Sequence, residues 1–191
     1  MRQLIHDNLF SGLWLAWSLY WWISARGGKT VARKESVASR IGHLLPLFIA
    51  GYLLWAQRLP GSFLCGKAWS ATEATFWTGA SLLALGLGFS VWARLTIGRN
   101  WSATVTVKED HELIRSGPYR FARHPIYTGL LLGFIGTAVA RAEWRGVLAV
   151  AIVFAALWRK LRLEERWMAE TFGGQYAAYK RKVRALAPFL F

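Results

Sequence analysis

The sequence predicts an all-α integral membrane protein with about five transmembrane helices. Hydrophobic residues make up 54% of the 191 residues, and twelve residues are Trp. This composition is unusual for a soluble domain of that length. Five apolar stretches approach or reach the length that crosses about 30 Å of hydrocarbon. No linker or solenoid repeat divides residues 1–191, so we expect a single membrane domain.

The first three apolar stretches, at 8–24, 43–59 and 74–97, predict three N-terminal spans within residues 1–97. The first stretch follows Arg2 and resembles a signal peptide in length. Its small-residue cleavage pattern is poor, however, and it contains four Trp. We therefore interpret it as a transmembrane helix.

The last two stretches, at 124–140 and 144–159, are short and are separated by three residues, which predicts a helical hairpin. Small residues that recur every four positions favour close packing of membrane helices. We expect such packing at Ala80, Ala84 and Gly88 in the third span and at Gly129 and Gly133 in the fourth.

Lys and Arg are concentrated in 24–42, 98–123 and the tail after the fifth span. Short cytoplasmic loops carry such an excess, so the N-terminus is predicted outside and the C-terminus in the cytoplasm. The net charge of +14 is scattered around helix ends, which favours anionic lipid headgroups over nucleic acid as partner. The single Cys65 excludes an internal disulfide, and no metal site is expected.

Residues 98–191 carry most of the polar patterns of the chain. Residues 102–107 alternate in a short extended pattern, and Ser116-Gly117-Pro118 indicates a turn. Pro125 suits the first turn of the fourth span, where its missing N–H costs nothing. Three nearby side chains can form hydrogen bonds at this boundary: Tyr119, His124 and Tyr127.

Two acidic residues, Glu164 and Glu165, follow the fifth span by about one turn. Glu164 has two readings from spacing alone. It either pairs with Lys160 four residues earlier on a solvated helix face, or it meets a cationic group of a ligand.

Three segments together resemble the signature of the isoprenylcysteine carboxyl methyltransferase family: HELI, GPYRFARHPIYTG, and EERWMAETFGGQYAAYKRKV followed by Pro188. Members of this family are integral membrane methyltransferases related to phospholipid methyltransferases. The resemblance covers about residues 98–188. It implies S-adenosyl-L-methionine as methyl donor, S-adenosyl-L-homocysteine as product, and a cytoplasmic cofactor pocket built from the last helices and the loop between them. Residues 98–191 would then form the cofactor-binding, catalytic half.

The resemblance also implies which residues contact the cofactor. Carried over position by position they are His111, Glu112, Leu113, Ile114, Tyr119, His124, Pro125, Ile126, Tyr127 and Glu164. The family usually has an Arg, associated with the substrate carboxylate, four residues before the Glu. Here that position is Lys160, next to Arg159, and we expect these two at the substrate. Lys keeps the charge and loses the bidentate geometry of Arg, so the acceptor stays open.

The implied chemistry assigns no catalytic residue. Glu164 suits the donor ammonium, and a carboxylate acceptor is already ionised, so positioning and exclusion of water supply the acceleration. An amine, phenol or thiol acceptor would have to lose a proton, with His124 or Tyr127 nearest. Candidate acceptors are a prenylated protein, a lipophilic small molecule and a membrane lipid.

Three alternatives stay open. One is a phospholipid or small-molecule N-, O- or S-methyltransferase of the same superfamily. Another is an enzyme similar to the sterol reductases that uses NADPH, and the third is a non-enzymatic membrane scaffold. No strand followed by a glycine-rich turn occurs, so a Rossmann-type cofactor site is not expected.

Overall fold

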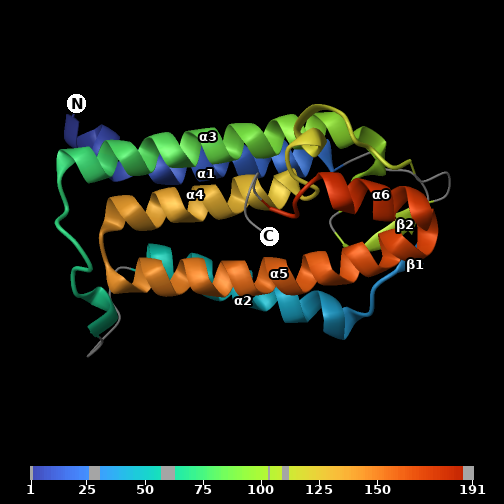
Figure 1. The fold of residues 1–191 in the computed structure, drawn as a ribbon. Helices are drawn as coiled ribbons and strands as arrows, with labels where there is room; N and C mark the ends of the chain where they lie inside the picture. Colours follow the sequence, from blue (N-terminus) through green and yellow to red (C-terminus); the bar gives the residue numbers. More distant parts are fainter. Residues whose placement is uncertain (1, 26–30, 57–62, 103, 109–111, 187–191) are drawn as a thin grey trace.

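Five long helices form an antiparallel bundle, and successive helices run in alternate directions (Figure 1). The computed structural model describes residues 2–25, 31–56, 63–102, 104–108 and 112–186. The long helices are α1 (Arg2–Ser24), α2 (Val37–Trp55), α3 (Glu73–Ile97), α4 (Pro125–Arg141) and α5 (Trp144–Phe172). The short elements are β1 (Val31–Lys34), η1 (Phe63–Cys65), η2 (Gly98–Asn100), β2 (Thr106–Lys108), η3 (Gly117–Arg120) and α6 (Gly174–Lys182).

The all-α class is confirmed, and each predicted apolar stretch falls on one of the long helices. In the described residues, α2 and the segment Glu73–Asn100 are long and apolar enough to cross a bilayer, and α4 is a shorter apolar helix. Helix α2 begins six residues before the predicted start at 43, because the Ser36 side chain caps it by accepting from the Ser39 N–H at 3.2 Å. Residues 57–59 of that predicted span lie outside the described part.

Helix α5 continues well past the predicted end of the fifth span at 159. Its 29 residues correspond to about 43 Å at 1.5 Å per residue, which exceeds the hydrocarbon thickness of about 30 Å. One rigid helix therefore carries Glu164 and Glu165 beyond its apolar part. Helix α5 ends at Gly173, whose φ of 49° lets the chain reverse into α6.

Helices α3 and α4 make the closest contact of the bundle through glycines. A Cβ on Gly129 would lie 2.8 Å from Cβ of Ser90, and one on Gly79 would lie 2.8 Å from Cβ of Ala140. The prediction for Gly129 is confirmed, whereas Gly88 faces open space. Gly133 also packs against α3, where a Cβ would lie 3.2 Å from Leu83, so the expected spacing of four holds on α4. On α3 it does not hold, because the close contact is made by Gly79 and Gly86, seven residues apart, and Ala84 is exposed.

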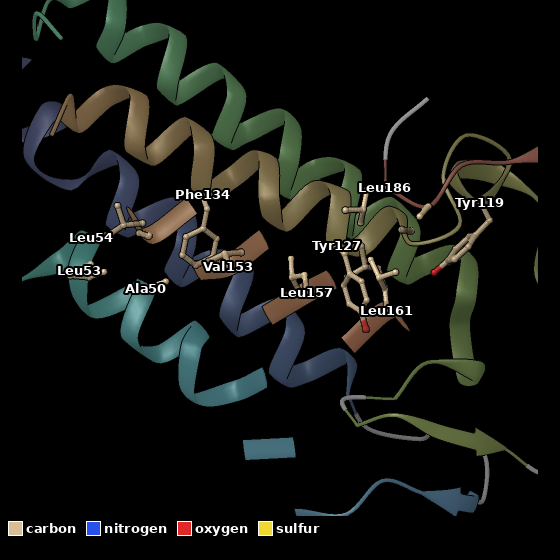
Figure 2. Packing of buried hydrophobic residues seen from close by; sticks show 14 residues of the cluster. Ala50, Leu53, Leu54, Tyr119, Tyr127, Phe134, Val153, Leu157, Leu161 and Leu186 are labelled. Atoms are coloured by element: carbon tan, nitrogen blue, oxygen red, sulfur yellow. The ribbon is translucent and has the colours of Figure 1, made fainter. Parts of the chain in front are cut away.

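The remaining long helices enclose an apolar core. Figure 2 shows Leu54 of α2, Phe134 of α4 and Val153 of α5 packed together. Helix α1 is fixed by two indole hydrogen bonds, from Trp14 to Thr137 at 3.1 Å and from Trp17 to Ser90 at 2.7 Å.

A small antiparallel sheet joins the connection between α1 and α2 to the connection between α3 and α4. Val31 pairs with Lys108 and Lys34 pairs with Thr106. The alternating pattern of 102–107 thus ends in strand β2, but its partner β1 was not predicted. Glu35 extends the junction, since its backbone N–H donates to the Val105 carbonyl at 3.0 Å and its carboxylate accepts from the Val105 N–H at 3.1 Å. The sheet and α6 lie at the same end of the bundle (Figure 1).

Candidate functional site

A cavity of about 380 Å³ is lined by residues of α1, α2, α4, α5 and α6 and of the connection between α3 and α4. Nine of the ten residues predicted to contact a cofactor line it, which brings together parts of the chain that are far apart in sequence. They are Glu112, Leu113, Ile114, Tyr119, His124, Pro125, Ile126, Tyr127 and Glu164. The tenth, His111, lies outside the described residues.

Glu164 meets His124 and Tyr127 across this cavity. The Tyr127 hydroxyl donates to Oε1 of Glu164 at 2.5 Å, and Nδ1 of His124 lies 3.4 Å from Oε2. The two rings stack almost parallel, with 5.4 Å between centroids and 2° between planes. The Glu164 side chain keeps 23% of its surface exposed, so the carboxylate is accessible from the cavity.

Backbone contacts fix the two ring-bearing residues. His124 directly precedes α4, whose first residue is Pro125, and a spacing of three puts His124 and Tyr127 on one face. The N–H groups of Arg123 and His124 donate to the carbonyls of Arg184 and Ala185 at 2.8 and 2.9 Å. The segment 183–186 therefore holds the start of α4 in place.

The Glu164 carboxylate is negatively charged at neutral pH. Burial raises its pKa, but the hydrogen bond from His124 and the nearby charge of Lys160 lower it more, so the pKa of Glu164 lies below its ordinary value. Lys160 precedes Glu164 by about one helical turn and lines the same cavity, so the site holds an anion and a cation side by side.

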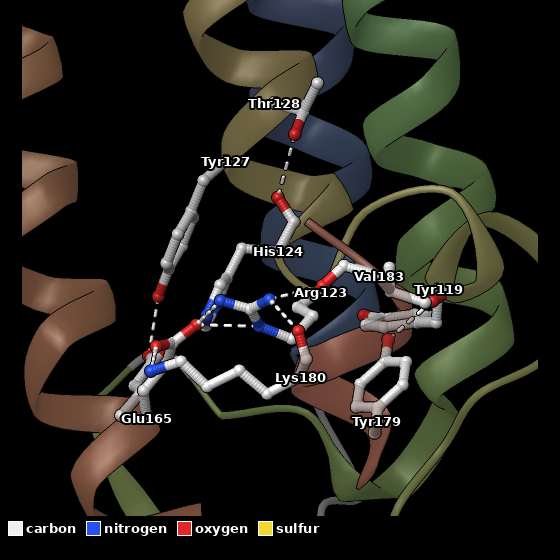
Figure 3. Close-up of polar contacts among 10 residues, drawn as sticks. Tyr119, Arg123, His124, Tyr127, Thr128, Glu165, Tyr179, Lys180 and Val183 are labelled. Carbon is white, nitrogen blue, oxygen red and sulfur yellow. Dashed lines mark hydrogen bonds and ion pairs between the residues drawn. The ribbon is translucent and has the colours of Figure 1, made fainter. Parts of the chain in front are cut away.

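Glu165, for which no role was expected, forms an ion-pair network with Arg123, His124 and Lys180 (Figure 3). Its carboxylate accepts from Nε of Arg123 at 2.8 Å and from Nζ of Lys180 at 2.8 Å, and Nε2 of His124 lies 3.5 Å away. Burial raises the pKa of Glu165, but hydrogen bonds from His124, Lys180 and Arg123 hold it well below its ordinary value. These partners are 15 and more residues away, so no local spacing could have indicated them.

Tyr119 is held between α6 and the cavity. The Tyr179 hydroxyl donates to its carbonyl oxygen. Burial and the negative charge of Glu164 raise the pKa of the Tyr119 phenol, so it stays protonated and available as a hydrogen-bond donor.

Of the two predicted substrate contacts, only Lys160 lines the cavity. Its Nζ lies 5.3 Å from the centroid of the Tyr127 ring. Arg159 points to α2 instead, where Nη1 donates to the Ser39 carbonyl at 3.0 Å. Neighbouring positions on a helix diverge by about 100°, and here that divergence turns Arg159 toward α2 and Lys160 toward the cavity.

The cavity also has an apolar wall that was not predicted. It is lined by Trp17 and Trp21 of α1, Leu44 and Leu47 of α2, and Leu130 of α4. The four-residue spacing of Trp17 and Trp21 is a signal that places them on one helix face. The cavity thus combines a charged side with an apolar side, as a ligand with a cationic group and a lipophilic partner would require. Within the described ranges, no group of three or more His, Cys, Asp or Glu could hold a metal ion.

Comparisons with known proteins identify the family of the chain. A family model described as phospholipid methyltransferase matches residues 74–175. The chain is 30% identical over 118 residues to protein-S-isoprenylcysteine O-methyltransferase B of Arabidopsis thaliana, covering 59% of this chain and 58% of that protein. It is 34% identical over 133 residues to cobalt-zinc-cadmium resistance protein CzcN of Cupriavidus metallidurans, covering 68% of this chain and 58% of that protein.

A solved structure of a eukaryotic intramembrane Ras methyltransferase, isoprenylcysteine carboxyl methyltransferase, aligns with a TM-score of 0.53 and 26% identity. The alignment covers 80% of this chain and 52% of that one. The chain therefore spans slightly more than half the length of the proteins it matches. The match of the family model to more than half of the chain, together with these relatives, confirms the resemblance found in the sequence. The chain belongs to the phospholipid methyltransferase family, in the branch that resembles the isoprenylcysteine carboxyl methyltransferases.

Proposed function

We propose that the chain is a membrane-embedded, S-adenosylmethionine-dependent methyltransferase that methylates a lipophilic acceptor. The observation that carries this proposal is the ionised Glu164 carboxylate in a cavity formed by the family's sequence motifs. The family match favours this function over the reductase-like and scaffold alternatives.

The residues present fit the donor. The cavity volume of about 380 Å³ falls in the range of small-molecule sites. Glu164 would hold the donor ammonium in a charge-assisted hydrogen bond, with S-adenosylhomocysteine held in the same way as product. Leu113, Ile114 and Ile126 offer apolar surface for the adenine. S-adenosylmethionine supplies a methyl group on a positively charged sulfur.

The side chains of the site would act by orientation. Tyr127 and His124 fix the Glu164 carboxylate by contacts at 2.5 and 3.4 Å, which limits how the donor can lie. Lys160 lines the same cavity and would hold the acceptor carboxylate at its charged end. A carboxylate is already a nucleophile at neutral pH, so positioning in a water-poor cavity supplies the acceleration and no general base is needed.

The acceptor that fits best is an isoprenylcysteine-like acid, or another lipid-soluble acid. Its apolar chain would lie along the wall of Trp17, Trp21, Leu44, Leu47 and Leu130 and would enter sideways from the bilayer between helices. The donor would arrive from the aqueous side. The names of the plant relative and the solved structure support this substrate class.

The cavity would face the cytoplasm of a five-span protein. Its end of the bundle includes most of the basic residues, among them Arg33, Arg99, Arg123, Lys160 and Lys180. An excess of positive charge marks the cytoplasmic ends of membrane helices, which puts the N-terminus outside.

Methyl labelling tests this function and separates the acceptor classes. Membranes containing the protein are incubated with S-adenosylmethionine labelled on the methyl group and with an S-farnesylated N-acetylcysteine. We expect label in a lipophilic product that alkali releases as methanol, as a carboxyl methyl ester requires. Alkali-stable label in phospholipid would indicate headgroup methylation instead. Absence of transfer, together with absence of S-adenosylhomocysteine binding in calorimetry, would refute the methyltransferase.

A further inference from the structure

We propose that Asn100 and Glu112 form a second polar subsite in the cavity, which binds the vicinal hydroxyls of the donor's ribose. This inference rests on the proposed function and adds a role for Asn100, which lies outside the motifs that carry the resemblance. Both residues line the cavity with Glu164. They come from different elements, because Asn100 follows α3 and Glu112 follows β2, whereas Glu164 is on α5.

Asn100 presents a hydrogen-bond acceptor that needs a partner. The residue is 8% exposed, and Nδ2 lies 3.4 Å from Oε2 of Glu112. A carboxylate only accepts hydrogen bonds, so the amide must turn its nitrogen to Glu112 and keep its oxygen for another group. That oxygen is buried and has no hydrogen-bond partner among the described residues. Buried polar atoms without partners are rare, so a ligand that donates a hydrogen bond fits this position.

The turn that carries Asn100 is held by its neighbours. Gly98, with a φ of 55°, ends α3 and begins the short helix η2. Nη1 of Arg94 donates to the Gly98 carbonyl at 2.8 Å, and the same guanidinium lies 4.5 Å from the centroid of the Trp101 ring. Trp101 itself lines the cavity. A site whose ligand groups are fixed in advance binds with less loss of conformational entropy.

The chemistry of the pair selects a diol. The Asn100 amide oxygen and the Glu112 carboxylate are two acceptors next to each other, and a ribose offers two O–H donors on adjacent carbons. A carboxylate is also the group that dinucleotide-binding folds use for ribose hydroxyls. Because Glu164 would already hold the ammonium at one end of the donor, the hydrogen-bond donors left are the two ribose hydroxyls and the adenine amino group, and only the hydroxyls lie on adjacent carbons.

Calorimetry with ligand analogues tests the inference. We expect the wild-type protein to bind S-adenosylhomocysteine with a Kd at least about tenfold lower than that of its 2′-deoxy or its 3′-deoxy analogue, the loss of one hydrogen bond to a charged or buried partner. In Asn100→Leu, the Kd of each deoxy analogue should exceed the Kd of S-adenosylhomocysteine by about twofold or less. Gln175→Leu is the matched control, because it removes an amide that bonds to Arg115 on the surface of α6.

Each outcome decides the matter. Equal binding of both deoxy analogues to the wild type would overturn the inference without any variant, even if Asn100→Leu failed to fold. A ratio unchanged in Asn100→Leu would also overturn it. The inference would also be overturned if Asn100→Leu bound S-adenosylhomocysteine and S-inosylhomocysteine with equal Kd, because Asn100 would then recognise the adenine amino group. Failure of the wild type to bind S-adenosylhomocysteine would instead remove the proposed function.

Discussion

Replacing Glu164 with Gln tests the assignment of the donor's ammonium most directly. The substitution keeps the size of the side chain and an acceptor for the Tyr127 hydroxyl, which donates at 2.5 Å. It removes the negative charge that faces His124 at 3.4 Å and that would face the ligand. The positive charge of Lys160, which lowers the pKa of Glu164 in the native site, would then lack its anionic neighbour.

The magnitude follows from the burial of the pair. Truncating one partner of a buried, hydrogen-bonded charge pair costs about 2–5 kcal/mol of binding free energy. A value of about 3 kcal/mol weakens the Kd for S-adenosylhomocysteine about 150-fold. Isothermal titration calorimetry in detergent micelles measures this directly.

Glu170→Gln is the matched control. It makes the same change of charge on the same helix, but Glu170 pairs with Arg33 at 2.7 Å and its side chain is 50% exposed. Exposed ion pairs contribute little, so we expect less than about a threefold change in Kd. Unchanged binding in Glu164→Gln, or equal losses in both variants, would refute the assignment.

Three further predictions concern stability and the acceptor. The folded-state pKa of Glu165 is lowered, so its stabilisation is present above its unfolded pKa of about 4.3 and disappears as pH falls toward the folded value. The Tm difference between wild type and Glu165→Gln should therefore be large at pH 7 and shrink below about pH 4.5, and a pH-independent difference would contradict this. Gly129→Ala puts a Cβ 2.8 Å from that of Ser90 and should destabilise the bundle by about 1–3 kcal/mol in thermal unfolding. Gly88→Ala is the control, because its Cβ meets open space and should not lower the Tm. Leu47→Trp puts a larger side chain beside the space proposed for the acceptor's apolar chain and should raise the KM for a farnesylated acceptor by about tenfold or more. The Kd for S-adenosylhomocysteine should stay unchanged in calorimetry. A selective loss of donor binding would contradict this position for the acceptor chain.

The helices of the bundle could be predicted well because uninterrupted apolar runs are a local sequence signal of membrane helices. The regions around all five long helices were predicted, and the errors lie at their ends. The start of α2 depends on the Ser36 cap, and the length of α5 depends on a charged segment that hydropathy cannot distinguish from a loop. Strand β1 pairs with residues more than 70 positions away, so local pattern could not indicate it.

The candidate site was likewise predicted only in part. Positions within the matching motifs, such as Tyr127 and Glu164, line one cavity as the resemblance implied. Trp17 and Leu47 line it from helices outside those motifs, and only tertiary packing brings them there. Arg159 and Lys160 are adjacent in sequence, but helix geometry separates them, so a match by position could not choose between the two charges.

The hydrogen bonds from Arg123 and His124 to the carbonyls of residues 184 and 185 bear on biosynthesis. A nascent chain that ends shortly after α5 would contain His124, Tyr127 and Glu164. The backbone before α4 would, however, lack the carbonyl groups of residues 184 and 185 as hydrogen-bond acceptors. If the proposed donor site requires these two hydrogen bonds, it would form only after residue 186 has left the ribosome. Prematurely terminated translation products should accordingly be inert rather than partially active.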